Sequence, residues 1–459
     1  MTKDEAPRPR GAAVSARGVA AQVLVRVEQD AAFAAAALDA ELSRAVQMSG
    51  RDRALATELA YGTLRVLPWL DARIGRHAKK GIAGMEPRAR AHLQIAAYQL
   101  FFLSRVPAFA AVSEGVDAVR AASGPKVAGF ANAVLRALAR EAAGGPAPVE
   151  EAVVQSAAPW LREALARAIG EEEVTPFLLG DGRDRDARTP PLGIRVEREE
   201  ERGAWLERLR EAAPDGSFEP GRVSPLAILG RGAGKPQALP GWSEGAWSVQ
   251  EEGSQLVALA LGARPGETIL DACAGRGNKT GVLAAAVGPN GSVDAVDVHP
   301  AKLEQLARGL QRTGRAIRAG YAVDWSVGSG DVPSGYDRIL VDAPCSGIGT
   351  LRRRPDLQIR RTAEELASLT ALQRAITQRA AVHLRPGGRL VFAVCSVLRE
   401  EAEDVVQSLL GTSPDLEPAP FDAPSVRAAL SAPDLASLRL LPHIHGTDGY
   451  FLASFVRRR

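Results

Sequence analysis

Arg338-Ile-Leu-Val-Asp-Ala-Pro-Cys-Ser-Gly347 is the stretch of sequence from which the fold can be worked out. Its apolar first half has the length and composition of a buried strand, and an acid, a proline and a thiol follow it directly. Further along, a second apolar run, Arg389-Leu-Val-Phe-Ala-Val394, leads into Cys395. Because ligands of open parallel α/β sheets bind outside the carboxyl ends of the strands, we expect Cys345, Cys395 and Asp342 to form a reaction site.

Around these two runs, strands and helices alternate from residue 246 to residue 459, which predicts a doubly wound, mostly parallel sheet of seven strands. The other five strands are expected at 268–272, 291–298, 316–323, 438–441 and 450–456. A long helix at 363–384 is expected to join the two cysteine-bearing strands and to end before Pro386-Gly-Gly388. Segment 411–437, rich in Pro, Ser and Asp, is expected to be an insertion or a loop.

The part of the chain before this region divides into three segments. Residues 1–16 are polar and are expected to form a flexible arm. From 17 to 140 the apolar residues recur at helical spacing, which predicts an all-α bundle with a break at Gly124-Pro125. Residues 150–245 mix a helical pattern with short strand signals, which predicts a small α+β module that follows a linker.

Composition limits the class of protein. With 459 residues, of which 46% are hydrophobic, the chain is long and apolar enough for two or three folded domains. Three cysteines argue against a disulfide framework and for a reducing cytoplasm. A formal net charge of +3 permits nucleic acid as a partner without indicating it. No run of about 18 apolar residues occurs, so we expect no membrane span. The start, Met1–Arg10, has no apolar core, so we expect no signal peptide.

The glycine-rich stretch Asp271-Ala-Cys-Ala-Gly-Arg-Gly-Asn-Lys-Thr280 has three interpretations. A phosphate-binding P-loop needs Gly-Lys-Ser/Thr, but Asn278 precedes the lysine. A dinucleotide-binding fingerprint needs a third glycine where Thr280 stands. The remaining interpretation is an adenosine cofactor without a pyrophosphate, such as S-adenosylmethionine, with the glycines allowing the backbone to approach it closely.

Acids at the ends of successive expected strands support a ligand site. Asp297 ends the second strand and is expected to bind the ribose hydroxyls. Asp324 ends the third and is expected to accept from the adenine amino group, and Asp342 ends the fourth. Each acid alone is more often a solvated loop residue, but three in succession favour a ligand site over that alternative.

Two thiols beside a methyl donor indicate a specific reaction. Carbon 5 of cytosine is not nucleophilic, but a thiolate that adds to carbon 6 makes it so. The reaction needs a thiol of lowered pKa and a base that has left its stack. It also needs a group that holds N3 and N4 of the base, for which Asp342 is the candidate. The third thiol, Cys273, is interpreted as a small buried hydrophobe.

At these residues the chain resembles the bacterial Sun-type family of RNA cytosine-5 methyltransferases. The resemblance covers nearly the whole chain and rests on Asp342-Ala-Pro-Cys-Ser-Gly-Ile-Gly-Thr350, Leu270-Asp-Ala-Cys-Ala274 with Lys279-Thr280, Cys395-Ser396 with Glu400-Glu401, and Thr447-Asp-Gly-Tyr-Phe451. Residues 17–140 resemble the NusB-like RNA-binding domain of family members that act on small-subunit ribosomal RNA. That part of the resemblance rests on Glu58-Leu-Ala-Tyr-Gly-Thr-Leu-Arg65 and Gly129-Phe-Ala-Asn-Ala-Val-Leu-Arg136.

The resemblance implies a fold, a reaction and roles for residues. The fold is an all-α NusB-like bundle, the α+β module and a Rossmann-like α/β methyltransferase domain that binds S-adenosylmethionine. The reaction is methylation of carbon 5 of a cytosine in RNA, with 16S ribosomal RNA as the expected substrate, by a cytoplasmic monomer through a covalent bond to carbon 6. Cys395 is the implied nucleophile, and Cys345 assists product release. The implied cofactor residues are Cys273, Ala274, Gly275, Arg276, Gly277, Asn278, Lys279, Asp297, Asp324 and Asp342; no metal is implied.

The sequence departs from the family pattern and leaves alternatives open. The family's Cys-Ala-Ala-Pro-Gly-Gly-Lys loop here contains Gly275, Arg276 and Asn278, and Val394 stands where Thr is usual. The alternatives are a transfer-RNA substrate, a non-catalytic RNA-binding or assembly factor, and exchanged thiol roles, as in DNA cytosine-5 methyltransferases, whose nucleophile lies in a Pro-Cys motif. Arginines after the Pro-Cys motif are expected to hold RNA phosphates: Arg352, Arg353, Arg354, Arg360 and Arg361.

Overall fold

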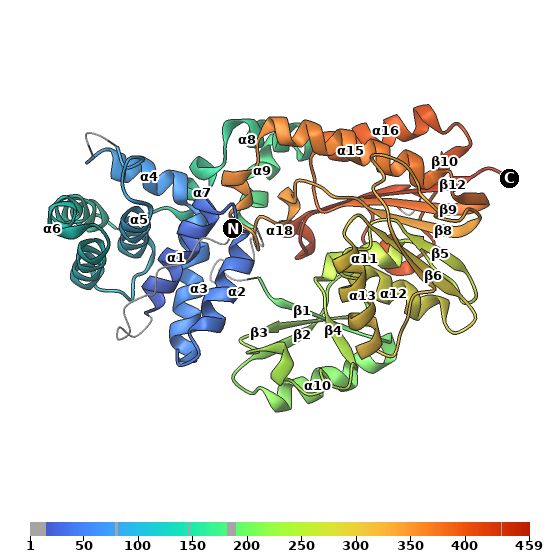
Figure 1. Cartoon of the computed structure of the whole chain (residues 1–459), viewed down its shortest axis with the longest axis horizontal. Helices are drawn as coiled ribbons and strands as arrows, with labels where there is room; N and C mark the ends of the chain where they lie inside the picture. Colours follow the sequence, from blue (N-terminus) through green and yellow to red (C-terminus); the bar gives the residue numbers. More distant parts are fainter. Residues whose placement is uncertain (1–14, 79–80, 146, 181–189, 433) are drawn as a thin grey trace, which may run out of the picture. The chain divides into compact units, whose positions relative to one another are not determined.

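The computed structural model describes residues 15–78, 81–145, 147–180, 190–432 and 434–459. Of the expected N-terminal arm, residues 1–14 therefore lie outside the described residues. The chain forms two compact units (Figure 1). Unit 1 comprises Met1–Ala158 and Arg354–Arg360, and unit 2 comprises Pro159–Arg353 and Arg361–Arg459.

Unit 1 is helical, as predicted for its N-terminal part. Its helix α5 is buried almost all round from Ala89 to Phe102, and a helix without an exposed face is the centre of a bundle. Helix α1 begins at a capped end, where the Ser15 side chain accepts from the Gly18 N–H at 3.1 Å. The helices of unit 1 are α1 (Ala16–Gln29), α2 (Ala34–Arg44), α3 (Gly50–Arg65), α4 (Leu67–Gly75), α5 (Pro87–Phe102), α6 (Ala108–Ala142), α7 (Val149–Ser156) and α14 (Leu357–Arg360).

Packing between α3 and α5 explains part of the N-terminal motif. A Cβ atom at Gly62 would lie 2.1 Å from Tyr98 Oη, so a side chain there would displace the Tyr98 ring. The same hydroxyl donates to Glu58 Oε1 at 2.6 Å, one turn earlier on α3. The break predicted at Gly124-Pro125 is confirmed: Gly124 has φ 80° and ψ 177°, which is not helical, so α6 consists of two helices that meet at a kink.

Segment Arg354–Arg360 packs in the helical unit although it follows the Pro-Cys motif in the sequence. Asp356 Oδ2 accepts from Ala34 N at 3.3 Å, which satisfies a backbone donor at the start of α2. Gln358 Nε2 donates to Arg65 O at 2.7 Å, at the end of α3. The segment thus supplies hydrogen-bonding groups to the ends of two helices that lie far away in the sequence.

Unit 2 begins with α8 (Pro159–Ile169) and α9 (Glu171–Leu179), followed by the predicted small α+β module. Four antiparallel strands have the order β2-β3-β1-β4, and α10 (Arg202–Ala212) contributes to their core. Trp247 and Ile194 are fully buried in that core. The strands are β1 (Leu192–Val196), β2 (Ser217–Pro220), β3 (Ala227–Arg231) and β4 (Trp247–Val249).

The second sheet of unit 2 has the order β10-β12-β9-β8-β5-β6-β7, with β11 beside β12. The five strands from β7 to β9 are parallel, and β12 runs antiparallel to β9. The seven predicted strands are confirmed within the described residues, but segment 411–437 is not a plain loop, because it contains β10 and α17 (Pro424–Ala428). The strands are β5 (Thr268–Asp271), β6 (Ser292–Asp297), β7 (Ala319–Ala322), β8 (Tyr336–Asp342), β9 (Leu384–Val394), β10 (Leu416–Pro418), β11 (Ser437–Leu440) and β12 (Tyr450–Arg457).

Helices cover both faces of this sheet (Figure 1). α15 (Ala363–Ala381) and α16 (Glu403–Thr412) pack on one face; α11 (Glu252–Ala260), α12 (Asn278–Val287) and α13 (Pro300–Arg312) pack on the other. Ile339 and Val341 of β8 therefore point into one core and Leu340 into the other. α15 ends at Ala381, earlier than predicted, and Pro386-Gly-Gly388 lies inside β9. The short helix α18 (Pro442–His445) connects β11 to β12.

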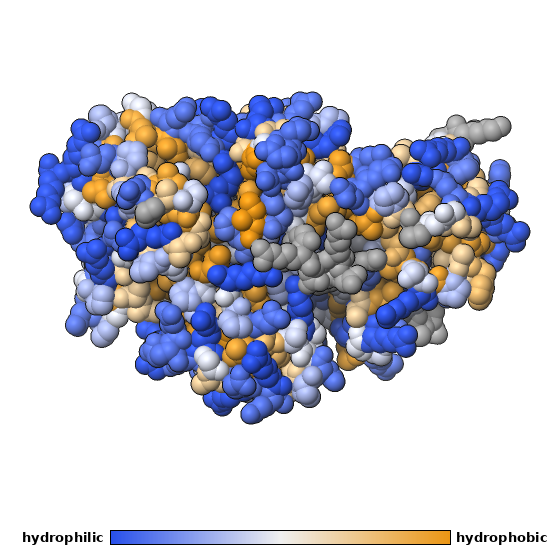
Figure 2. Space-filling model, turned by 180° about the vertical axis from the view of Figure 1, so that it is seen from behind, coloured by the Kyte–Doolittle hydropathy of each residue, from blue (hydrophilic) through white to orange (hydrophobic). Residues whose placement is uncertain are grey.

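The surface hydropathy and the lengths of the helices are those expected from the composition. On the face shown in Figure 2, hydrophilic residues cover most of the surface, and apolar residues appear between them. In the described parts of the chain, every helix is too short or too polar to cross a lipid bilayer.

Candidate active site

The carboxyl ends of β5, β8 and β9 lie where the strand order reverses. β5 comes first of these strands in the sequence, with β6 on one side and β8 on the other. In α/β sheets, ligands bind in the crevice at such a point. The segments that leave these ends are the glycine-rich loop after β5, the Pro-Cys loop after β8 and Cys395 after β9.

The two predicted thiols lie together at this edge. Cys345 Sγ and Cys395 Sγ are 2.9 Å apart, and both cysteines are free and partly buried. The hydrogen bond to Cys395, with burial and the charges of Glu401 and Asp342, raises the pKa of the Cys345 thiol well above its usual range. Cys345 therefore holds its proton firmly and is suited to donate it toward the sulfur of Cys395.

A lysine and an acid form an ion pair beside the thiols. Lys279 Nζ, from the start of α12, lies 2.6 Å from Asp342 Oδ2 at the end of β8. Burial works against the charge of Lys279, but the Asp342 carboxylate outweighs burial and raises the pKa of the ammonium, and Cys395 contributes in the same direction. The ammonium thus places a positive charge where it stabilises a thiolate at Cys395. The sequence placed Lys279 only in the cofactor loop.

A buried carboxylate holds the Pro-Cys loop in place. Glu401 is fully buried and accepts from Ser346 N at 2.7 Å and from Ser346 Oγ at 2.5 Å. Gln373 Nε2, on α15, donates both to Glu401 Oε1 and to Pro344 O, each at 2.9 Å. The residues on both sides of Cys345 are therefore fixed by hydrogen bonds to α15 and to the 3₁₀ helix η4 (Arg399–Glu401).

A close backbone contact joins the Pro-Cys loop to the Thr447–Phe451 motif. Gly449 N donates to Gly349 O at 2.7 Å, and Gly349 N donates to Cys395 O at 3.1 Å. A Cβ atom at Gly349 would lie 2.0 Å from Gly449 O, so a side chain would separate the two loops. The motif therefore helps to hold the two cysteine-bearing segments next to each other.

The arginines that were expected to hold RNA phosphates have structural partners instead. Arg352 Nε and Arg353 Nε lie 2.5 and 3.0 Å from the buried Asp448 Oδ1. Arg361 Nε donates to Ser346 O at 2.9 Å. Within unit 1, Arg360 donates to a backbone carbonyl in front of α2 and stacks over the Phe33 ring at 4.3 Å. Each of these four arginines thus has a partner within the protein, whereas the fifth, Arg354, is exposed. Phosphate binding by the five stays a prediction.

The glycine-rich loop has the shape that close approach of a ligand requires. Gly275 and Gly277 have φ of 56° and 86°, a region that suits glycine. A Cβ atom at Gly277 would lie 2.6 Å from Leu306 Cγ, whereas one at Gly275 would meet no atom within 4 Å. Ala274 is buried, and the side chains of Arg276 and Asn278 are exposed. Burial raises the pKa of the Cys273 thiol, which packs against the core of the sheet, as expected for a small hydrophobe.

The acids at the ends of β6 and β7 differ in their surroundings. Asp297 is 9% exposed; its Oδ1 accepts from His299 N at 2.8 Å and lies 3.3 Å from Lys302 Nζ. Asp324 is exposed, and hydrogen bonds from Ser326 lower its pKa. An open glycine loop followed by an acid at the end of the neighbouring strand fits an adenosine cofactor.

Two supporting residues escaped the sequence analysis. Arg195 of β1 is 3% exposed, and its Nη1 donates to Asn278 O in the cofactor loop at 2.8 Å. The small α+β module therefore binds the start of α12 through this hydrogen bond. Trp325 Nε1 donates to Ala272 O at 2.8 Å, at the end of β5. The sequence signal for Arg195 was an arginine within an apolar strand pattern. No sequence signal pointed to Trp325.

Comparisons with known proteins place both parts of the chain. The sequence profile of the 16S rRNA methyltransferase RsmB/F family matches residues 258–456, and the profile of the NusB family matches residues 14–140. Similar curated proteins are a probable ribosomal RNA small subunit methyltransferase B of Synechocystis sp. and a ribosomal RNA small subunit methyltransferase B of Erwinia tasmaniensis. Each is 32% identical; the alignments cover 97% and 96% of this chain and 100% and 98% of the relatives.

Solved structures agree on the fold. The crystal structure of PH0851 matches with a TM-score of 0.77 at 24% identity, over 96% of this chain and 98% of that one. The structure of NSun6 from Pyrococcus horikoshii with SFG matches with a TM-score of 0.54 at 18% identity, over 66% of this chain and 98% of that one. SFG is an analogue of S-adenosylmethionine.

Proposed function

The chain belongs to the 16S rRNA methyltransferase RsmB/F family of S-adenosylmethionine-dependent RNA methyltransferases, and on that premise we propose which atom it methylates and how. The proposed reaction is methylation of carbon 5 of a cytosine in small-subunit ribosomal RNA, through a covalent bond between Cys395 and carbon 6. The observation that carries the proposal is the pair of thiols 2.9 Å apart beside the Lys279–Asp342 ion pair. Methylation of an exocyclic nitrogen or of a ribose hydroxyl requires no such thiols.

The cofactor and the base are assigned to opposite parts of the crevice. S-adenosylmethionine, when bound, supplies the methyl group. The glycine-rich loop from Cys273 to Asn278, Asp297 and Asp324 are proposed to hold it. Asp342 binds Lys279 through Oδ2, which leaves Oδ1 for the exocyclic amino group of cytosine. Asp342 ends β8, which lies between β5 with the glycine-rich loop and β9 with Cys395. This position suits a residue that is proposed to contact both the cofactor and the base.

Of the two thiols, Cys395 is the proposed nucleophile. Lys279 supplies a positive charge near it, and Cys345 holds the proton of the pair. The thiolate adds to carbon 6, and Cys345 gives its proton to N3 of the ring. Carbon 5 thereby becomes electron-rich enough to take the methyl group.

Cys345 is the proposed base in the release step. After methyl transfer, carbon 5 carries both the methyl group and its original hydrogen. The Cys345 thiolate takes that hydrogen as a proton, the double bond between carbons 5 and 6 re-forms, and Cys395 leaves as a thiolate. A thiolate whose pKa is raised is a strong base, which suits Cys345 for this step. N3 then loses its proton to water, so one proton is released for each methyl group transferred.

The proposal is tested by methyl transfer from cofactor labelled in the methyl group to small-subunit ribosomal RNA transcribed in vitro. Bisulfite sequencing of that RNA, and of RNA from a deletion strain, then locates the modified cytosine. We expect label at one cytosine that the deletion strain leaves unmodified. Label on transfer RNA alone would contradict the substrate, and absence of transfer to any RNA would favour the non-catalytic alternative.

We also propose the finer assignments that follow from a ribosomal substrate. The protein acts in the cytoplasm as a monomer, and the helical domain 17–140 contributes to RNA binding. The small module 150–245 supports the methyltransferase domain 246–459, for which the hydrogen bond from Arg195 to the cofactor loop is the supporting observation. Analytical ultracentrifugation of the purified protein at micromolar concentration tests whether it is a monomer.

A further inference from the structure

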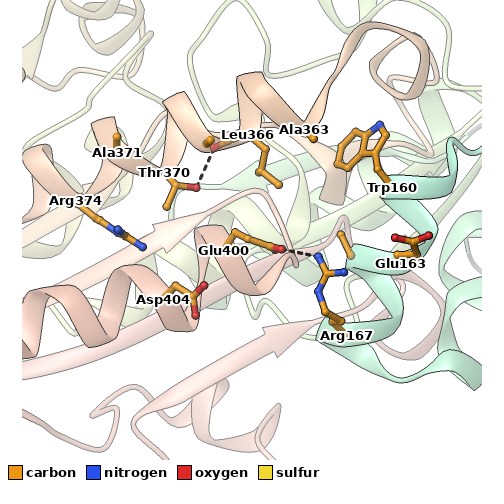
Figure 3. Close-up of a pocket in the computed structure, with 12 residues that line it drawn as sticks. Trp160, Glu163, Arg167, Ala363, Leu366, Thr370, Ala371, Arg374, Glu400 and Asp404 are labelled. Atoms are coloured by element: carbon orange, nitrogen blue, oxygen red, sulfur yellow. Dashed lines mark hydrogen bonds and ion pairs between the residues drawn. The ribbon is translucent and has the colours of Figure 1, made fainter.

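A cavity of about 390 Å³ lies in unit 2 on the outer side of α15, apart from the thiols (Figure 3). α8, the first half of α15, η4 and the start of α16 form its walls. Its volume lies in the range of sites that hold small ligands. No residue proposed above for the cofactor or for the reaction lines it.

One wall of the cavity is apolar and carries an indole. Trp160, from the first turn of α8, is partly exposed and lies toward one end of the cavity (Figure 3). Leu366 and small alanine side chains of α15 complete this wall. A flat aromatic surface of this kind is suited to stacking with a nucleic-acid base.

The Glu400 carboxylate in the cavity wall already has a partner. Glu400 Oε1 binds Arg167 Nη2 at 2.8 Å, as Figure 3 shows. The other oxygen, Glu400 Oε2, is buried and has no hydrogen-bond partner among the described residues. Buried carboxylate oxygens are rarely left so, because the loss of hydration is not compensated. Because Oε2 is closed to solvent, it is not a contact for a ligand in the cavity.

The charges of the wall suit a single nucleotide better than a polyanion. Glu400 is paired with Arg167, and Asp404 with Arg399. In the part of the chain that the structure describes, Glu163 and Arg374 form no ion pair, so one acid and one base stay available. Arg374 lies toward the end of the cavity opposite Trp160 (Figure 3). Its guanidinium is a ready partner for one phosphate.

The two elements that form the cavity also hold the thiol loop. On η4, Glu400 faces the cavity, while the next residue, Glu401, binds Ser346. On α15, Arg374 faces the cavity, while the preceding residue, Gln373, binds Pro344 O. Only η4 and α15 therefore lie between the cavity and the Pro-Cys loop. An RNA whose target cytosine lies at Cys395 can extend to the cavity.

We propose that this cavity binds a second, unstacked nucleotide of the substrate RNA, close to the target cytosine. Its base stacks on Trp160, and its phosphate binds Arg374. The proposal rests on the proposed function, because it takes the bound RNA to be the methylation substrate. It adds a recognition site for a nucleotide that lies near the modified base.

Affinity for short RNA tests the proposal without requiring methyl transfer. Fluorescence anisotropy is measured with the full chain, S-adenosylhomocysteine and a labelled single-stranded RNA that has one cytosine between adenosines. We expect Trp160→Ala and Arg374→Ala each to weaken binding on the order of tenfold. Trp160→Phe keeps an aromatic ring and should retain most of the affinity.

The matched control is Arg162→Ala, which removes an exposed arginine of α8 that does not line the cavity. Equal affinity of Trp160→Ala, Arg374→Ala and wild type would overturn the proposal, as would an equal loss in Arg162→Ala. If Trp160→Ala lost affinity for an arginine-rich peptide but kept that for RNA, the site would belong to a protein partner. A wild type that binds RNA and methylates none would refute the proposed function, and the affinity comparison would still decide the cavity.

Discussion

Asp297 ends β6 and Asp324 follows the end of the neighbouring strand β7, but the two acids differ in burial. Asp297 is nearly buried, whereas Asp324 is exposed to water, so the free energy of a hydrogen bond to a ligand is larger at Asp297. We expect Asp297→Ala to weaken S-adenosylmethionine binding by about 1–3 kcal/mol, measured by calorimetry. Asp331→Ala, which removes an exposed acid of the same unit, is the control. An affinity unchanged in both variants would remove Asp297 from the cofactor site.

Asp271 gives a pH-dependent prediction. Burial raises its pKa from 3.8 to about 6, against the hydrogen bond from Thr280 Oγ1 at 2.7 Å. Because the folded state holds this proton more tightly than the unfolded state, the stabilisation is present below the unfolded pKa and is lost as pH rises through about 6. Asp271→Asn does not titrate. Between about pH 4 and pH 7.5, the wild type should therefore lose about 2 kcal/mol of stability relative to the variant.

The measurement is thermal unfolding of both proteins across that pH range. The variant keeps an acceptor for Thr280 Oγ1, so the comparison isolates ionisation from the loss of a hydrogen bond. A stability difference that is the same at every pH would show that Asp271 ionises in the folded protein as freely as in the unfolded chain.

At the scale of elements, η4 and α15 position the Pro-Cys loop. Glu401→Ala removes the acceptor of Ser346 N and Ser346 Oγ, so Cys345 is no longer held beside Cys395. We expect kcat to fall on the order of 10- to 100-fold, as for a misplaced reacting group, with KM for the cofactor unchanged. The attack by Cys395 remains, so the covalent protein–RNA species should accumulate, because release is slowed.

Glu364→Ala, an exposed acid on the first turn of α15, is the control for this variant. Glu401→Gln keeps the shape and one acceptor oxygen and should recover part of the rate. If Glu401→Ala lowered stability and kcat without any accumulation of the covalent species, the carboxylate would support the fold only and would not position Cys345.

At the scale of the whole molecule, local patterns predicted most of the methyltransferase sheet. The apolar runs before Asp342 and Cys395 were long enough to identify as strands, and the topology of parallel sheets places their carboxyl ends together. The position of the thiols at one edge therefore followed from the sequence. The structure adds the distance between them and the ion pair that links Lys279 to Asp342.

The remaining features depend on contacts between distant segments. Arg352 and Arg353 look like a solvated charge run until Asp448, from the far end of the chain, folds against them. Arg195 belongs to the small module, and only tertiary packing brings it to Asn278. Strand β10 is too short to give a pattern and forms because the edge of β12 is available to it. Each of these features depends on a partner residue or strand that lies far away in the sequence, so no short stretch of sequence could predict it.

The central claim is that the two thiols divide attack and release between them. Without Cys395, carbon 5 is never activated, so Cys395→Ala should give neither methylated RNA nor covalent species. Without Cys345, attack and methyl transfer continue, with water supplying the proton for N3, but the carbon 5 proton is removed slowly. Cys345→Ala should therefore accumulate a protein–RNA adduct, and the double variant should not form it.

A denaturing gel of each variant, incubated with labelled ribosomal RNA and S-adenosylmethionine, tests this claim most directly. The account predicts a band of lowered mobility for Cys345→Ala and none for Cys395→Ala. The opposite pattern, an adduct in Cys395→Ala and an inert Cys345→Ala, would contradict it and would make the Pro-Cys thiol the nucleophile.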